Sequence, residues 1–154
     1  MPMRRTNLLW SLLSVAVLAG CGGGSEEDFE RDVVAARDRT NAALTQVTRA
    51  KSIDDLLKRL RIAATEIRSA ATDVQEADAP EDLGDEEQAL EEALRALSDE
   101  IVGVVDTFAE NQEIIATAGG FSFAAWDTVQ ARFADLRERG IDVRPLERLE
   151  PPTP

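Results

Sequence analysis

From residue 26 onward, apolar side chains recur at intervals of three and four residues, the period of an amphipathic helix. The pattern predicts four helices, over about residues 26–49, 52–77, 85–118 and 122–139. The apolar stripes of the first two are Phe29, Val33, Ala36, Thr40, Ala43 and Val47, then Ile53, Leu56, Leu60, Ala63, Ile67, Ala70 and Val74. Those of the last two are Leu90, Leu94, Leu97, Ile101, Val104, Phe108, Asn111 and Ile115, then Phe123, Trp126, Val129, Phe133 and Leu136.

Capping and breaking residues separate these stripes. Ser52, followed at the third helical position by Asp55, is typical of a helix start, and Pro80 ends the preceding helix. Gly119-Gly120 closes the third helix, and we expect Ser122 to cap the fourth, with Phe121 packing on Trp126. No Gly or Pro lies between the first two helices, so one bent helix through residues 48–52 is an alternative.

Four amphipathic helices with short connections predict an all-α, antiparallel, up-down-up-down four-helix bundle. It occupies residues 26–150 as one domain, followed by a disordered proline-rich tail, 151–154. The fourth helix is about half as long as the third, so one end of the bundle is expected to be three-stranded. Residues 141–149 would lie along the bundle or cap that end.

The N-terminus has the features of a signal peptide. Arg4 and Arg5 precede a short apolar run from Leu8 to Ala19, which is well below the roughly 20 residues of a membrane span. We therefore expect residues 1–20 to be cleaved. Residues 21–25 would form a short flexible tether.

The signal ends Leu18-Ala19-Gly20-Cys21, which resembles the lipobox of bacterial prolipoproteins at all four positions. The resemblance implies cleavage between Gly20 and Cys21, a diacylglyceryl thioether on Cys21, and further acylation, palmitate included, of the new N-terminus. An ordinary secretory signal with a chance cysteine is the alternative. Gly22 follows the cysteine, so the aspartate that retains lipoproteins of Gram-negative bacteria at the inner membrane is absent.

The body is similar to the small, alanine-rich helical lipoproteins of high-GC Gram-positive bacteria. The similarity rests on composition and on an acidic, proline-bearing turn, Ala79-Pro80-Glu81-Asp82-Leu83. Because those proteins mostly have no assigned activity, it carries over no functional residue.

Composition and charge narrow the classes of partner. The chain is 44% apolar and 31% charged, with a net charge of −13, and loss of Arg4 and Arg5 makes the mature chain more acidic still. Phosphate binding needs a basic surface, so a nucleic-acid partner is not expected. Close adhesion of the body to anionic head groups is disfavoured for the same reason.

The usual catalytic residues are missing. The chain has no His, and its single Cys is the one to be acylated, so neither a nucleophile–His pair nor a zinc site is expected. The acidic residues 76–87 do not fit an EF-hand, and we predict no metal and no cofactor beyond the lipid on Cys21. An enzyme using carboxylates alone is a distant alternative. Asn111, on the third stripe, either sets the register of the bundle or marks where the stripe turns outward.

Aromatic residues gather late in the chain, at Phe121, Phe123, Trp126 and Phe133. They either fill the core or form a patch for a partner or an apolar ligand. The sequence thus predicts a non-enzymatic binding or scaffold module on the extracytoplasmic face of the cell membrane, held by its lipid and bound to another envelope protein. The alternative is a carrier or sensor of a small apolar ligand, in a cavity lined by Phe108, Phe123 and Trp126.

Overall fold

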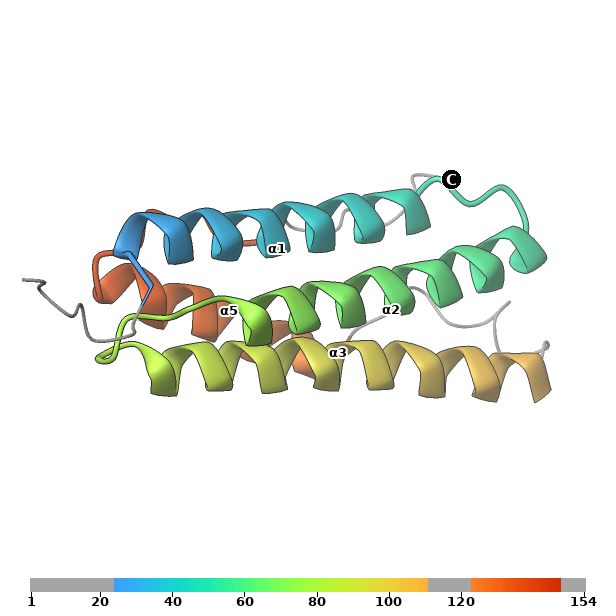
Figure 1. Ribbon diagram of the computed structural model, residues 1–154. Coiled ribbons are helices and arrows are strands. Elements are labelled where there is room, and N and C mark those ends of the chain that lie inside the picture. Colours follow the sequence, from blue (N-terminus) through green and yellow to red (C-terminus); the bar gives the residue numbers. More distant parts are fainter. Residues whose placement is uncertain (1–23, 111–122, 148–154) are drawn as a thin grey trace, which may run out of the picture.

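The computed structural model describes residues 24–110 and 123–147, and four helices account for most of them. They are α1 (Glu26–Val47), α2 (Ile53–Glu76), α3 (Gly84–Glu110) and α5 (Ala124–Glu138). Successive helices run in opposite directions, with α2 between α1 and α3, and α5 against α3 (Figure 1). The predicted all-α four-helix bundle is confirmed.

Local capping explains where α1 and α2 begin. Ser25 and Ser52 have extended backbones, and their hydroxyls accept the N–H of Asp28 and of Asp55, each at 3.1 Å. The carboxylate of Asp55 in turn accepts the N–H of Lys51 at 3.1 Å. α1 ends at Val47, so the first two helices are separate and the bent-helix alternative is wrong.

The helix ends differ from the predicted ones by up to two residues where the structure describes them. α1 stops at 47 rather than 49, α2 spans 53–76 rather than 52–77, and α3 starts at 84 rather than 85. Residues 111–118 of the predicted third helix, including Asn111 and Ile115, lie outside the described residues.

The buried face of α2 departs from the predicted stripe at its start. Leu60, Ala63, Ile67, Ala70 and Val74 are buried as expected, but Ile53 is 38% exposed. An α-helix drifts about 20° per heptad against a strict seven-residue repeat, so two heptads from Ile67 carry Ile53 off the core. The neighbouring Leu57 is buried in that turn instead.

The start of α5 also differs from the prediction. Its N-cap is Phe123, which makes no side-chain cap bond, so the assignment of Ser122 as cap is wrong. Glu100 of α3 does the capping: its two carboxylate oxygens accept the N–H groups of Ala124 at 2.9 Å and Ala125 at 2.8 Å. A carboxylate at the positive end of the α5 dipole is favourable.

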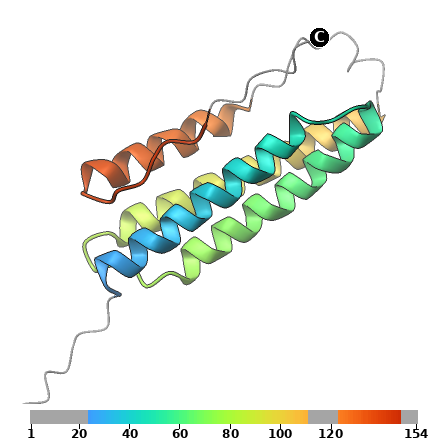
Figure 2. The same cartoon turned by 90° about the horizontal axis from the view of Figure 1, so that it is seen from above.

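After α5 the chain turns at Gly140, whose φ of 103° suits glycine, and runs back over the bundle. Figure 2 shows this return beside α5. We call residues 141–147 the strap. Ile141, Val143 and Leu146 are buried, so the predicted path along the bundle is confirmed for these residues.

Side chains hold the backbone of the strap. Gln130 of α5 donates to the carbonyl oxygen of Leu146 at 2.8 Å and accepts its N–H at 3.0 Å. Glu30 and Asn41 of α1 accept the N–H groups of Asp142 at 2.8 Å and Glu147 at 3.0 Å. The strap therefore joins α5 to α1.

Candidate functional site

The predicted lipidation and cleavage positions, Cys21 and Gly20, lie outside the described residues, and so does Phe121. Gly24 follows Cys21 by three residues. Gly24 lies so close to the α2–α3 loop that an added Cβ would overlap the carbonyl group of Asp78. The chain therefore enters the bundle beside this loop.

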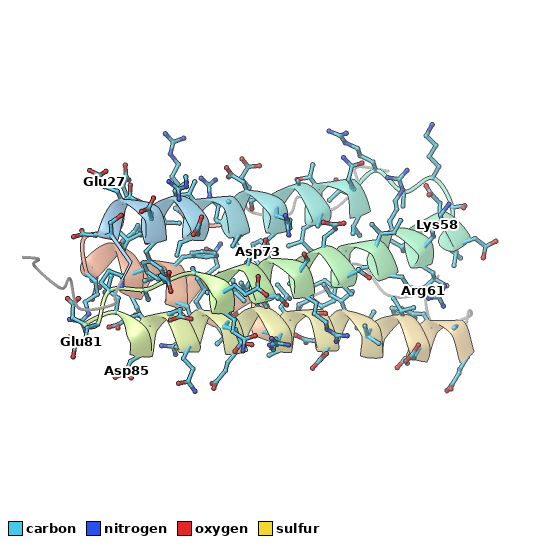
Figure 3. The ribbon with its side chains drawn as sticks, in the orientation of Figure 1. Glu27, Lys58, Arg61, Asp73, Glu81 and Asp85 are labelled. Carbon is cyan, nitrogen blue, oxygen red and sulfur yellow. The ribbon has the colours of Figure 1, made fainter. Side chains whose placement is uncertain are left out.

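The end at which the chain enters is strongly acidic. It combines the first turns of α1 and α3 with the end of α2 and the loop that follows. Its carboxylates are Glu26, Glu27, Asp28, Glu76, Asp78, Glu81, Asp82, Asp85, Glu86 and Glu87. Figure 3 shows Glu27, Glu81 and Asp85 together at this end.

The acidic end contains one ion pair that joins two elements, between Arg139 and Glu86. Nε of Arg139, just after α5, is 2.6 Å from Oε1 of Glu86, and this hydrogen bond holds the pKa of Glu86 below its ordinary value. The same pairing raises the pKa of Arg139. Arg139 also donates to the carbonyl oxygen of Asp82 at 3.4 Å, so it ties α5 to the α2–α3 loop.

Neighbouring Glu87 behaves in the opposite way. Burial raises its pKa, and the nearby charge of Asp78 raises it further. Within residues 24–110 and 123–147, no group of three or more Asp, Glu, His or Cys side chains has the arrangement of a metal site. The carboxylates of the acidic end that the structure describes are thus spread over the surface and do not converge on one point.

The aromatic residues of the described region pack inward. Phe133 is fully buried and Phe123 nearly so, and Trp126 lies partly buried against the same core. α5 packs these rings against α3. In this conformation they act as core residues rather than as an exposed aromatic surface.

A groove of about 300 Å³ lies between α2 and α3, away from these aromatic rings. Arg61, Thr65 and Arg68 line it from α2, and Ser98, Val102 and Asp106 from α3. Its lining shares none of the residues predicted for an apolar cavity, namely Phe108, Phe123 and Trp126. Open and partly charged, it suits a polar or amphipathic partner better than a small apolar ligand.

Sequence reasoning missed four polar residues that position whole elements. Glu30, Asn41, Glu100 and Gln130 bind backbone groups 16 to 112 positions away in the chain. A Gln or Asn among alanines gives no sign of such a distant partner. Asn41 gave the one available signal, because it lies next to the predicted apolar face of the first helix and could therefore have been expected to be buried.

Comparisons with known proteins give no relative: no family, no curated protein and no solved structure matches the chain. In the part of the chain that the structure describes, no helix is both long and apolar enough to cross a bilayer.

Proposed function

We propose that the protein is a bacterial lipoprotein, anchored through Cys21 to the extracytoplasmic face of the cell membrane, whose helical body is a non-enzymatic binding or scaffold module. The observation that carries the proposal is Leu18-Ala19-Gly20-Cys21 at the end of a short, positively flanked apolar segment. Lipid attachment by two or more acyl chains gives stable anchoring, which one chain alone does not.

The geometry of the body is compatible with such an anchor. The first helix is capped at Ser25, four residues after Cys21, so the link between lipid and bundle is short. An extended chain spans at most about 3.5 Å per residue, which keeps the bundle within roughly 15 Å of the acylated cysteine. The acidic end is then the end nearer the bilayer, and its charge disfavours close contact with anionic lipids.

The non-enzymatic part of the proposal rests on the residues available. The chain has no His, and an acylated Cys21 has no thiolate to serve as a nucleophile. Binding to another envelope protein needs neither. An anchored bundle with an exposed groove is suited to that task.

Intact-mass measurement on protein extracted from membranes tests the anchor. We expect a chain beginning at Cys21 whose mass exceeds that of the polypeptide by a diacylglyceryl group, with or without an amide-linked acyl chain. Cys21→Ser should carry no lipid and keep its signal peptide, whereas the control Gly23→Ala should be processed normally. A mature N-terminus elsewhere, or a lipid-free Cys21, would refute the proposal.

A further inference from the structure

Charge is distributed unevenly along the bundle. Figure 3 shows Glu27, Glu81 and Asp85 at the end where the chain enters, and Lys58 and Arg61 toward the opposite end. The only two lysines of the chain, Lys51 and Lys58, both lie at the connection between α1 and α2 or in the first turns of α2. Both lysines of this acidic protein thus lie far from the end at which the chain enters.

Four exposed cations in this region have no ion-pair partner within the described residues: Arg49, Lys51, Lys58 and Arg61. Arg59, by contrast, is paired with Asp55 at 2.9 Å. Asp54, Asp106 and Glu110 lie in the same half of the bundle, so the positive surface is confined to the α1–α2 connection and the adjoining face of α2.

Exposed apolar side chains gather in the same half. Ile53 (38% exposed), Ile62 (51%) and Val102 (38%) are the exposed large hydrophobic residues of the described region. Ile53 and Ile62 belong to the first half of α2, and Val102 to the second half of α3. Ile53 and Ile62 are nine residues apart in α2 and so lie on opposite sides of that helix. Only Ile62 and Val102 are therefore available to one partner beside the unpaired cations.

The α2–α3 groove joins the two features, because both Arg61 and Val102 line it. From Arg61 to Arg68 it follows α2 for about 10 Å, or two helical turns. Ala64 and Val105 form its closed floor, and Arg68 is held by Asp99 at its far end. A groove between two antiparallel helices has the shape that receives a third helix.

We propose that this groove, together with Arg49, Lys51, Lys58 and Ile62, is the docking surface for an acidic amphipathic helix of another envelope protein. Its aliphatic side chains would cover Ile62 and Val102, and its carboxylates would pair with Lys58 and Arg61. We call this set of residues the docking surface. Its placement facing away from the membrane rests on the proposed lipid anchor.

The charge balance favours an acidic protein over the protein's own membrane as the occupant. α2 is 24 residues long, so the docking surface extends from about 35 Å from the acidic end, at the start of α2, to about 12 Å from it, at Arg68. The full chain has a net charge of −13 with these four cations already counted, so electrostatics disfavours the body lying on its own anionic bilayer. An acidic helix would meet Lys58 and Arg61 along α2, with Asp106 as the one carboxylate among the residues that line the groove.

Site-specific photocrosslinking in intact cells tests the proposal with the full chain. A photoreactive residue at position 62 should give an adduct with one protein, mapped by mass spectrometry to an acidic amphipathic helix. The same residue at Thr128, exposed on α5, is the matched control and should not give that adduct. An adduct with lipid, with a second copy of this chain or with a non-protein polymer would overturn the proposal, as would no adduct.

Charge variants supply the second readout. The double variant Lys58→Glu/Arg61→Glu should reduce the adduct about tenfold, and the conservative pair Lys58→Arg/Arg61→Lys should retain it. The double variant Arg137→Glu/Arg144→Glu, an equal change of charge at exposed positions of α5 and the strap, should have no effect. An adduct unchanged by the double reversal would refute the docking surface, provided circular dichroism shows the variant folded.

The experiments distinguish a wrong docking surface from a wrong lipid anchor. A lipid on Cys21 without an adduct at position 62 removes only the docking surface. An adduct formed by a chain without lipid removes the anchor and leaves the docking surface in place.

Discussion

Single polar side chains fix the ends of helices in this bundle. Glu100 caps α5 from the neighbouring helix, and Arg139 ties the end of α5 to Glu86 at the start of α3. An unsatisfied helix end costs free energy comparable to a lost hydrogen bond for each group. These residues therefore affect stability although none of them belongs to the core.

Removing the Glu100 cap should destabilise the fold. Glu100→Ala leaves the N–H groups of Ala124 and Ala125 without their acceptor, and we expect a loss of about 1–2 kcal/mol in the free energy of unfolding. Glu100→Gln should lose less, because an amide oxygen still accepts. Urea denaturation measures the change, and Glu66→Ala, at an exposed site on α2, is the control. Equal stability of Glu100→Ala and the control would contradict this role.

The ionised carboxylates of Glu86 and Glu87 should have opposite effects on the free energy of unfolding. Pairing with Arg139 lowers the pKa of Glu86 in the folded state, so its stabilisation is present at neutral pH and is lost as pH falls through that lowered pKa. Burial raises the pKa of Glu87, so its penalty is present at neutral pH and vanishes below the ordinary glutamate pKa.

Substitution by glutamine separates these two contributions. At about pH 7, Glu86→Gln should lower the urea midpoint and Glu87→Gln should raise it, and both differences should shrink toward about pH 3. Unfolding curves of the three proteins at several pH values supply the measurement. Shifts of the same sign at pH 7 would contradict the assigned environments.

At the scale of elements, the strap compensates for the shortness of α5. α5 has 15 residues against 27 in α3, and it packs on α3 rather than closing directly on α1. Ile141, Val143 and Leu146 fill the remaining space, and Gln130 and Asn41 satisfy the strap backbone. The strap thus covers the part of the core that the short α5 leaves open.

Weakening the strap should loosen it before the bundle unfolds. Leu146→Ala leaves a cavity and should cost about 2–4 kcal/mol, and Gln130→Ala, which removes two hydrogen bonds, about 1–2 kcal/mol. Both variants should be cut faster by a glutamate-specific protease after Glu147, whose N–H is held by Asn41 in the closed strap. Thr128→Ala, exposed on α5, is the control. Unchanged cleavage in Leu146→Ala would show that the strap is not held as described.

At the scale of the whole molecule, ten carboxylates of this acidic chain lie at the end where the chain enters, and Figure 3 shows three of them, Glu27, Glu81 and Asp85. These ten carboxylates on neighbouring turns repel one another, and Arg139, next to the end of α5, pairs with one of them, Glu86. Such repulsion destabilises the compact state and is screened by salt. The bundle tolerates it because the core is continuous from α1 through α5.

Stability should therefore rise with ionic strength. Between about 10 mM and 0.3 M NaCl the Debye length falls from roughly 30 Å to below 8 Å, and we expect the urea midpoint to increase. Glu81→Gln/Asp85→Asn should raise the midpoint at low salt and reduce its salt dependence. Thr128→Ala should follow the parent protein. A midpoint that falls with salt would show that attractive ion pairs outweigh the repulsion.

The sequence by itself determined the helical bundle. Helical periodicity, Ser52, Pro80 and the absence of strand-forming runs define α1, α2 and the start of α3 to within two residues, although Ser25 was expected in the tether and is the cap of α1. These are local effects, since capping and amphipathicity depend on neighbours only a few positions away. The lipobox is equally local, and the anchor inferred from it stays a prediction.

Only the tertiary structure decided how the elements close on one another. The cap on α5 is a glutamate 24 positions earlier, and the strap is held by Glu30 and Asn41, more than 100 positions away. Which face of α2 is exposed, and hence the grouping of Ile62 with Arg61 and Val102, depends on the rotation of packed helices. Contacts of this kind depend on three-dimensional packing, and the spacing of residues along one chain carries little trace of them.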